Sequence, residues 1–250
     1  MNTLALATQY TFWITFCGMS AASLYFFMER SSLPEKYRSV ATLAGVYTFI
    51  AAVNYYNMKE IVGLSGDPAT LLNFPTALRY IDWLITTPLI LLKFPALLGN
   101  SEKLDVFVLA IALIVLDVVM IVCGYFGEIS INAADKSTGL GWALFVGSCI
   151  AWVLIIVMLF RVISVGSENK VKPIRRALNQ LKYFIVFGWA IYPIGYLVTL
   201  IAPGPEVQMV REMVYNFADL VNKVGFGFVA IYACTQIARD EEIKAEIARM

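Results

Sequence analysis

Seven long apolar segments dominate this chain of 250 residues. Each is long enough to cross the roughly 30 Å hydrocarbon core of a bilayer as an α-helix. Short joins containing proline and glycine separate the segments, so neighbouring helices should run antiparallel. We therefore predict an all-α membrane protein, a single domain over residues 1–250 built as a bundle of seven transmembrane helices. The predicted spans are residues 6–28, 38–62, 75–98, 104–126, 139–162, 177–201 and 209–237.

Composition supports this class and excludes several others. The chain is 60% hydrophobic and only 15% charged, which is far from the balance of a soluble domain. It contains no histidine, so histidine acid–base catalysis and histidine metal ligation are excluded. The four cysteines lie in apolar runs without metal-like spacing and are interpreted as small buried side chains. A net charge of +1 gives no basic footprint for a nucleic-acid partner.

The distribution of lysine and arginine predicts the orientation. Basic residues concentrate in the joins after the first and fifth segments and in the C-terminal tail, and Lys103 adds to the same side. The other side carries only Lys59, Lys136 and Arg211. The positive-inside rule therefore places the N-terminus outside and the C-terminus in the cytoplasm of a multi-pass plasma-membrane protein. The tail at 239–249 is predicted to be a charged, solvated helix end.

Lys223 lies in the middle of the last apolar segment, where a charge is costly. Asp219 precedes it by four residues, which places both side chains on one face of a helix, one turn apart. A structural ion pair between packed helices would explain this pattern. A lysine condensed with an aldehyde, giving a protonated Schiff base beside its counterion, would explain it equally well.

The third predicted helix carries a second set of ionisable residues on one face. Arg79, Asp82 and Lys93 belong to a stripe with steps of three or four residues, and Asp82 lies about 16 Å from Lys93 along the axis. Pro88 frees a backbone carbonyl, and the two threonines before it can bond locally. Polar contacts between helices would explain one such charge, but not three on one stripe together with those of the last helix. The stripe comprises positions 79, 82, 83, 86, 90 and 93.

Several segments resemble the microbial (type 1) rhodopsins. Residues 79–88 (RYIDWLITTP) resemble the third helix of that family, residues 216–223 (NFADLVNK) the seventh, and residues 189–193 (WAIYP) the sixth. Residues 119–128 and 148–153 are most similar to the proteorhodopsin group. The resemblance covers all seven segments in order, and it implies the family's fold and chromophore.

The resemblance implies roles for individual residues. Lys223 would hold all-trans retinal as a protonated Schiff base, with Asp82 as primary counterion and proton acceptor and Asp219 as second counterion. Arg79 would stabilise both carboxylates and gate the outward side. The chromophore pocket would comprise Trp83 and Trp189 on the two faces of the polyene, with Thr86, Thr87, Ile90, Met120, Gly124, Phe145, Ser148, Tyr192, Pro193 and Tyr196.

The function implied is that of a light-driven outward proton pump, a transporter rather than an enzyme. Isomerisation of the buried chromophore would redirect the Schiff-base proton toward Asp82, and reprotonation would come from the cytoplasm. We expect a homo-oligomer in the lipid bilayer. A carotenoid antenna is not expected, because Phe145 stands where antenna-binding relatives have glycine.

Two positions depart from the usual pattern of such pumps. Lys93 stands where a carboxylic acid is common, and burial disfavours its charged form. We expect it to stay neutral in the dark and to take up a cytoplasmic proton after the Schiff base has lost its own. The alternative is that Lys93 extends to the interface as a structural anchor. Asn54 replaces the histidine that proteorhodopsin places beside the primary counterion, so histidine-linked control of Asp82 is not expected.

Competing functions of the family fit less well. A sodium pump should carry an Asn-Asp-Gln pattern along the third helix, a chloride pump should lack a carboxylate at Asp82, and inward proton pumps differ at Asp219. A slow-cycling photosensory rhodopsin remains the alternative, since a chain without a carboxylic proton donor could return slowly to its dark state.

Overall fold

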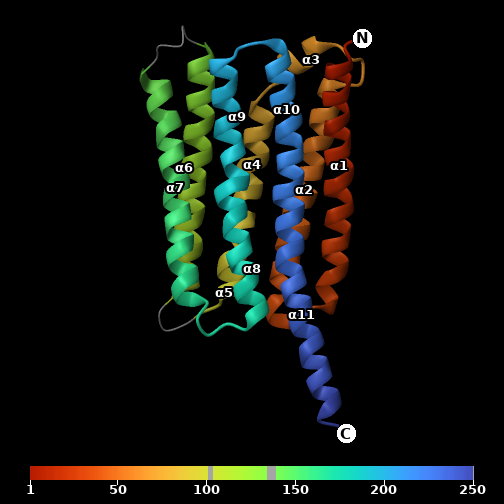
Figure 1. Ribbon diagram of the computed structural model, residues 1–250, viewed down its shortest axis with the longest axis vertical. Helices are drawn as coiled ribbons and strands as arrows, with labels where there is room; N and C mark the ends of the chain where they lie inside the picture. Colours follow the sequence, from red (N-terminus) through yellow and green to blue (C-terminus); the bar gives the residue numbers. More distant parts are fainter. Residues whose placement is uncertain (101–103, 134–138, 250) are drawn as a thin grey trace.

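The computed structural model describes residues 1–100, 104–133 and 139–249, and its long elements are all helices. They stand side by side as a bundle, with the N-terminus at one end and the C-terminal helix projecting from the other (Figure 1). Within the described residues the bundle has seven membrane-length rods, which confirms the predicted all-α fold. In chain order, the rods are α1 (Thr3–Glu29), α2 (Arg38–Val62), α4 (Ala77–Leu91) with α5 (Lys93–Leu98), α6 (Val106–Ala133), α7 (Gly139–Gly166), α8 (Lys172–Tyr183) with α9 (Trp189–Ile201), and α10 (Pro205–Leu220) with α11 (Phe226–Ile247).

The ends of the rods differ in detail from the prediction. The fourth rod, α6, continues to Ala133 rather than ending at 126, and the last rod begins at Pro205 and continues as a helix to Ile247. A short helix, α3 (Pro68–Leu72), lies in the join after α2 and is capped by Asp67. Gly63 and Gly99 end α2 and α5 with φ of 62° each, a conformation that favours glycine.

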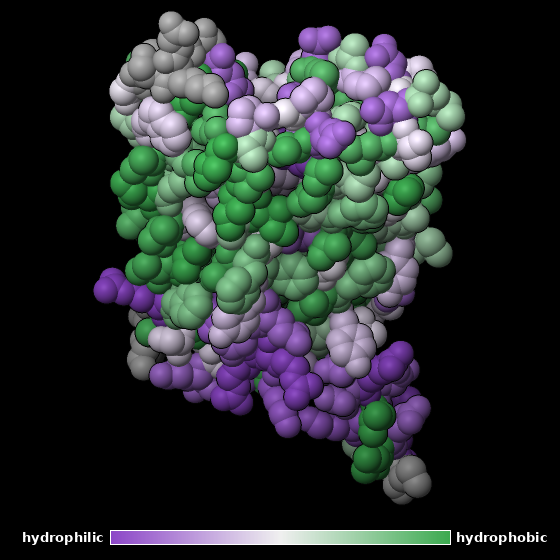
Figure 2. Space-filling view, turned by 45° about the horizontal axis from the view of Figure 1, so that its top comes forward, coloured by the Kyte–Doolittle hydropathy of each residue, from purple (hydrophilic) through white to green (hydrophobic). Residues whose placement is uncertain are grey.

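The bundle has an apolar surface and buried charged side chains, the reverse of the usual arrangement in a soluble protein. On the face seen in Figure 2, hydrophobic residues (green) cover the middle of the bundle and hydrophilic residues (purple) gather toward its ends, most densely at the C-terminal end. Exposed apolar side chains such as Phe107 and Phe187 suit contact with lipid, whereas charged side chains such as Arg79 and Lys93 are buried. Six rods are apolar enough to span a membrane, and α2 is the seventh by its length of 25 residues. Residues 239–249 are exposed, as predicted for the tail.

Three rods contain an interruption of the regular α-helix. In the third rod it falls at Leu92, between α4 and α5 and four residues after Pro88. The sixth and seventh contain π-helical turns at Phe184–Gly188 and Val221–Gly225. The second of these turns carries Lys223, so the irregular backbone lies where the predicted site lies.

Two basic residues used to predict the orientation, Lys103 and Lys136, lie outside the described residues. The placement of the N-terminus outside and the C-terminus in the cytoplasm therefore stays a prediction.

Candidate functional site

The amine of Lys223 lies between two buried carboxylates. Its Nζ atom is 2.5 Å from Oδ2 of Asp82 on α4 and 3.0 Å from Oδ2 of Asp219 on α10. All three side chains are at most 3% exposed. The predicted spacing of Asp219 and Lys223 does bring them into contact one turn apart, and the third helix supplies the second carboxylate.

The two carboxylates differ in the support they receive. Oxygens of Asp219 accept hydrogen bonds from the Tyr55 hydroxyl at 2.9 Å, the Trp83 indole at 3.1 Å and the Tyr192 hydroxyl at 2.5 Å. Apart from Lys223, the Asp82 carboxylate receives one such bond from the described residues, from Nδ2 of Asn54 at 3.0 Å. Hydrogen bonds to a carboxylate stabilise its ionised form, so Asp219 is the more firmly held anion.

A cavity lined mainly by aromatic and aliphatic side chains adjoins Lys223. Its position beside the amine, together with its few polar groups, fits an elongated apolar chromophore joined to that nitrogen. Sequence analysis missed the lining residues Tyr80, Ile121, Glu128, Cys149, Trp152, Tyr215 and Asn222. The predicted pocket residues that line it are Trp83, Thr87, Ile90, Met120, Gly124, Phe145, Ser148, Trp189, Tyr192, Pro193 and Tyr196.

Thr86 is the predicted pocket residue that is absent from the described lining. It is buried, and its hydroxyl donates to the Asp82 carbonyl at 2.8 Å. The Thr87 hydroxyl bonds the Trp83 carbonyl in the same way, also at 2.8 Å. Both hydroxyls thus bond the backbone carbonyl four residues earlier on α4, as expected for threonines that bond locally.

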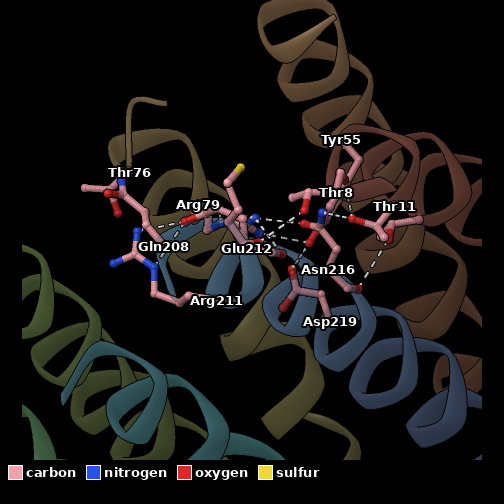
Figure 3. Close-up of polar contacts among 12 residues, drawn as sticks. Thr8, Thr11, Tyr55, Thr76, Arg79, Gln208, Arg211, Glu212, Asn216 and Asp219 are labelled. Atoms are coloured by element: carbon pink, nitrogen blue, oxygen red, sulfur yellow. Dashed lines mark hydrogen bonds and ion pairs between the residues drawn. The ribbon is translucent and has the colours of Figure 1, made fainter. Parts of the chain in front are cut away.

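Arg79 is paired with a carboxylate that the sequence analysis did not select. Its Nη2 atom lies 2.6 Å from Glu212 and 2.7 Å from the Asn216 side chain, both on α10 (Figure 3). It reaches Asp219 through the Tyr55 hydroxyl, which accepts from Arg79 at 3.2 Å and donates to Asp219. Arg79 was expected to stabilise Asp82 and Asp219, but it contacts neither directly among the described ion pairs.

The polar network continues away from Lys223 along α10. Arg211 contacts Glu212 at 2.7 Å and Glu128 at 3.6 Å, and the Tyr80 hydroxyl donates to Glu128 at 2.9 Å. Arg211 was used in the sequence only as a basic residue on the outer side, and its side chain is only 10% exposed. Arg79, Glu212, Arg211 and Glu128 thus form a chain of buried ion pairs on the side opposite Lys93.

Lys93 is 0% exposed, so its amine does not extend to the surface of the protein. Its Nζ atom donates to the hydroxyl of Tyr47 on α2 at 2.8 Å. The rings of Phe226 and Phe26 lie 5.5 Å and 6.0 Å from the amine. Burial among aromatic rings argues against the interfacial anchor that was the alternative for this lysine.

Asp117 is a further buried acid that the sequence analysis did not select. It lies on α6 at 0% exposure, and its Oδ2 atom bonds the Thr87 hydroxyl at 2.8 Å. Its other oxygen has no hydrogen-bond partner among the described residues. The available signal was an acid in the middle of the apolar segment 104–126, far from Asp105 at the start of that segment.

Side chains also support the π-helical turn at Phe184–Gly188. The Trp152 indole donates to the Ile185 carbonyl at 2.9 Å, and Nδ2 of Asn222 donates to the Gly188 carbonyl at 3.0 Å. Where a π-helical turn interrupts an α-helix, some backbone carbonyls have no hydrogen-bond partner within the helix. Such unsatisfied carbonyls are costly inside a membrane. These two residues therefore stabilise the irregular backbone beside the cavity.

The fold and this site define a class: seven-helix membrane proteins with a lysine buried between two carboxylates beside an apolar cavity. The chain belongs to the bacteriorhodopsin-like protein family, whose model matches residues 6–237. Membership implies retinal as the chromophore and confirms the predicted microbial rhodopsin. It also agrees with a multi-pass membrane protein, for which the plasma membrane is the usual location.

The individual proteins that this chain resembles are also rhodopsins. The chain is 34% identical over 227 residues to the green-light absorbing proteorhodopsin of Gamma-proteobacterium EBAC31A08, covering 89% of this chain and 86% of that protein. It is 31% identical over 170 residues to sensory rhodopsin-2 of Haloarcula vallismortis, covering 67% of each. The crystal structure of Exiguobacterium sibiricum rhodopsin superposes with a TM-score of 0.88 at 54% identity, covering 95% of this chain and 99% of that one. These names are those of rhodopsins, not of classical enzymes.

The Glu212 ion pairs generate a stability prediction. Glu212→Ala is expected to lower the free energy of unfolding by about 3–5 kcal/mol, because it leaves the buried guanidinium groups of Arg79 and Arg211 without this carboxylate. Unfolding in mixed micelles, followed by circular dichroism, measures the change. Glu206→Ala, exposed in the first turn of the same helix, is the matched control and should cost less than about 0.5 kcal/mol. Equal losses in the two variants would contradict the prediction.

Proposed function

We propose that this chain is a light-driven outward proton pump that uses all-trans retinal and moves protons from the cytoplasm to the outside. The observation that carries the proposal is the unequal support of the two carboxylates at Lys223. Asp82 lies 2.5 Å from the amine and has one further donor, whereas Asp219 has three. The less supported carboxylate is the one that more readily accepts a proton.

Lys223 would hold retinal through its nitrogen as a Schiff base, and the bound chromophore would supply light absorption and an isomerisation that changes the direction of the proton on that nitrogen. Asp82 is the proposed acceptor, because its Oδ2 atom is the nearest carboxylate oxygen. Asp219 remains ionised and keeps a negative charge beside the nitrogen throughout. The aromatic lining, including Trp83 and Trp189, holds the chromophore and excludes water.

The outward path is proposed to follow the Arg79 network. Arg79 is linked to Asp219 through Tyr55 and is ion-paired with Glu212. A positive charge held there favours an anion at the central site and opposes the return of a proton. Such a fixed arrangement can give direction to the transfer without a large rearrangement of the backbone.

The cytoplasmic path is proposed to use Lys93. The amine is buried on the opposite side of the site from Glu212, on the same stripe of the third rod as Asp82. A neutral amine in apolar surroundings can accept a proton from the cytoplasm and pass it on. We propose that this uptake follows loss of the proton from the Lys223 nitrogen.

We propose a single membrane domain that assembles as a homo-oligomer through its apolar belt, without a carotenoid antenna. Phe145 lines the cavity, and its ring lies 5.6 Å from that of Tyr196. A side chain there fills space that an antenna ring beside the chromophore would need.

A photosensor is the second candidate. The match to a sensory rhodopsin over two thirds of the chain favours it, and so does an amine in place of an acid at Lys93. Light-driven pH change separates the two functions. Cells that contain the protein and retinal should acidify an unbuffered medium under illumination, and a protonophore should abolish the change. A stable medium pH despite a photocycle would favour the sensor, and alkalinisation would indicate inward transport.

Lys223→Ala is expected to abolish covalent pigment formation, because it removes the nitrogen that lies between Asp82 and Asp219. Absorbance after addition of retinal measures pigment. Lys244→Ala, in the exposed tail, is the matched control and should form pigment normally. A visible pigment in Lys223→Ala without an added free amine would refute the assignment.

Asp82→Asn is expected to shift absorption to the red and to stop outward pumping. The positive charge on the Lys223 nitrogen loses a stabilising anion, and the proton loses its acceptor. Absorption spectra and light-driven acidification are the measurements, with the exposed Asp240→Asn as control. Undiminished acidification by Asp82→Asn would place the acceptor elsewhere.

Lys93→Ala is expected to leave the dark colour nearly unchanged, because the charges around Lys223 are retained. It should slow reprotonation of the Lys223 nitrogen increasingly as pH rises, by roughly 100-fold at the alkaline end. Flash photolysis from about pH 6 to 9 tests this, because a buried amine is expected to change its protonation state within that pH range. Identical kinetics in wild type and Lys93→Ala would favour direct uptake from water.

A further inference from the structure

The hydroxyl of Tyr47 joins Lys93 to the backbone that carries the central lysine. Tyr47 lies on α2 at 0% exposure. Its hydroxyl donates to the backbone carbonyl of Lys223 at 2.8 Å and accepts from Nζ of Lys93 at 2.8 Å. The phenol thus bridges the third and seventh rods at the π-helical turn.

Because the Tyr47 hydroxyl donates its hydrogen bond to the Lys223 carbonyl, it can only accept a hydrogen bond from Lys93. The single phenol proton is directed at that carbonyl, so the lone pairs of the oxygen are left to accept from the amine. An ammonium group needs such acceptors, whereas a neutral amine can do without them. Tyr47 therefore favours the protonated form of Lys93 in a place where burial opposes it.

Few other groups can take over this role. Among the described residues, the titratable groups that face Lys93 are the Tyr47 phenol on α2 and the Cys234 thiol on α11. Within the described residues no carboxylate forms an ion pair with Lys93, and the rings of Phe26 and Phe226 complete its surroundings. The phenol oxygen is the acceptor that the described neighbours provide for the amine.

We propose that Tyr47 is a positioning residue that sets the pH range over which Lys93 takes up a proton and the Lys223 nitrogen is reprotonated. The proposal rests on the proposed function, in which Lys93 is the uptake group. A proton from the cytoplasm bonds to the lone pair of the Lys93 amine, and the resulting ammonium donates to the Tyr47 oxygen. Lys93 later releases that proton toward the Lys223 nitrogen and returns to the neutral amine, while the phenol keeps its own proton throughout.

Tyr47→Phe tests the role of the phenol oxygen alone, because it removes the hydroxyl and retains the ring that packs against the core. Flash photolysis of the intact pigment from about pH 6 to 9 compares wild type, Tyr47→Phe, Lys93→Ala and the double variant. In Tyr47→Phe the dark absorption should be unchanged, and the pH at which reprotonation begins to slow should fall by about one unit, ~10-fold in proton concentration. The double variant should match Lys93→Ala, because Tyr47 acts through the amine.

Thr48→Val is the matched control. It removes a buried hydroxyl from the next position of α2, and that hydroxyl bonds only the Ala44 and Gly45 carbonyls of its own helix among the described residues. Its pH profile should be that of wild type. If Tyr47→Phe fails to form pigment, 3,5-difluorotyrosine at position 47 keeps the shape and weakens the oxygen as an acceptor, and should shift the profile in the same direction.

The outcomes separate this inference from the proposed function. If Lys93→Ala slows reprotonation but Tyr47→Phe and the fluorinated variant keep the wild-type profile, the role of Tyr47 is overturned and that of Lys93 stands. An equal effect of Tyr47→Phe in the presence and absence of Lys93 also overturns it, because the tyrosine would then act on packing alone. If Lys93→Ala itself has no effect, the uptake role of Lys93 is lost, and that of Tyr47 with it.

Discussion

The rest of the structure depends on keeping the Lys223 amine buried between Asp82 and Asp219. Separating charges from water is expensive, and removing one partner of a buried ion pair leaves an uncompensated charge that costs about 3–5 kcal/mol. Each carboxylate is therefore supported in turn, Asp219 by three donors and Asp82 by Asn54. The arginine and glutamate side chains beyond them extend this compensation along α10. The charges of Arg79, Asp82, Asp219 and Lys223 are thus compensated inside the bundle, and its outer surface is left largely apolar.

The irregular backbone follows from the same constraint. A regular helix satisfies its own carbonyls, so the π-helical turns expose groups that must find partners inside the bundle. Trp152 and Asn222 supply donors to the turn at Phe184–Gly188, and Tyr47 supplies one at Lys223. The same side chains line the cavity or contact the buried lysines. Backbone support and site construction are thus shared by the same residues.

Sequence periodicity predicted the parts of the site that lie along one helix. Asp219 with Lys223, and Arg79 with Asp82 and Lys93, were identified because each set recurs at helical spacing among apolar residues. The contacts between rods were not predictable in this way. Glu212 meets Arg79 from another helix, and it was missed because an acid near a helix end usually faces solvent. Tyr47 was one aromatic residue among many, and its role depends on a register slip in α10–α11 that no residue pattern marks.

The two halves of the bundle are unequal in a way that suits directional transfer. On the Arg79 side, charged, amide and hydroxyl groups from three rods form a continuous network. On the Lys93 side, one amine and one phenol are surrounded by phenylalanine rings. A proton is easily stabilised in the first region and poorly in the second. In the proposed cycle, a charge would therefore form at Lys93 only briefly, and the lifetime of that charge would depend on the acceptor that Tyr47 provides. An acid at this position would carry its proton in the dark, whereas a buried amine acquires one when it is needed.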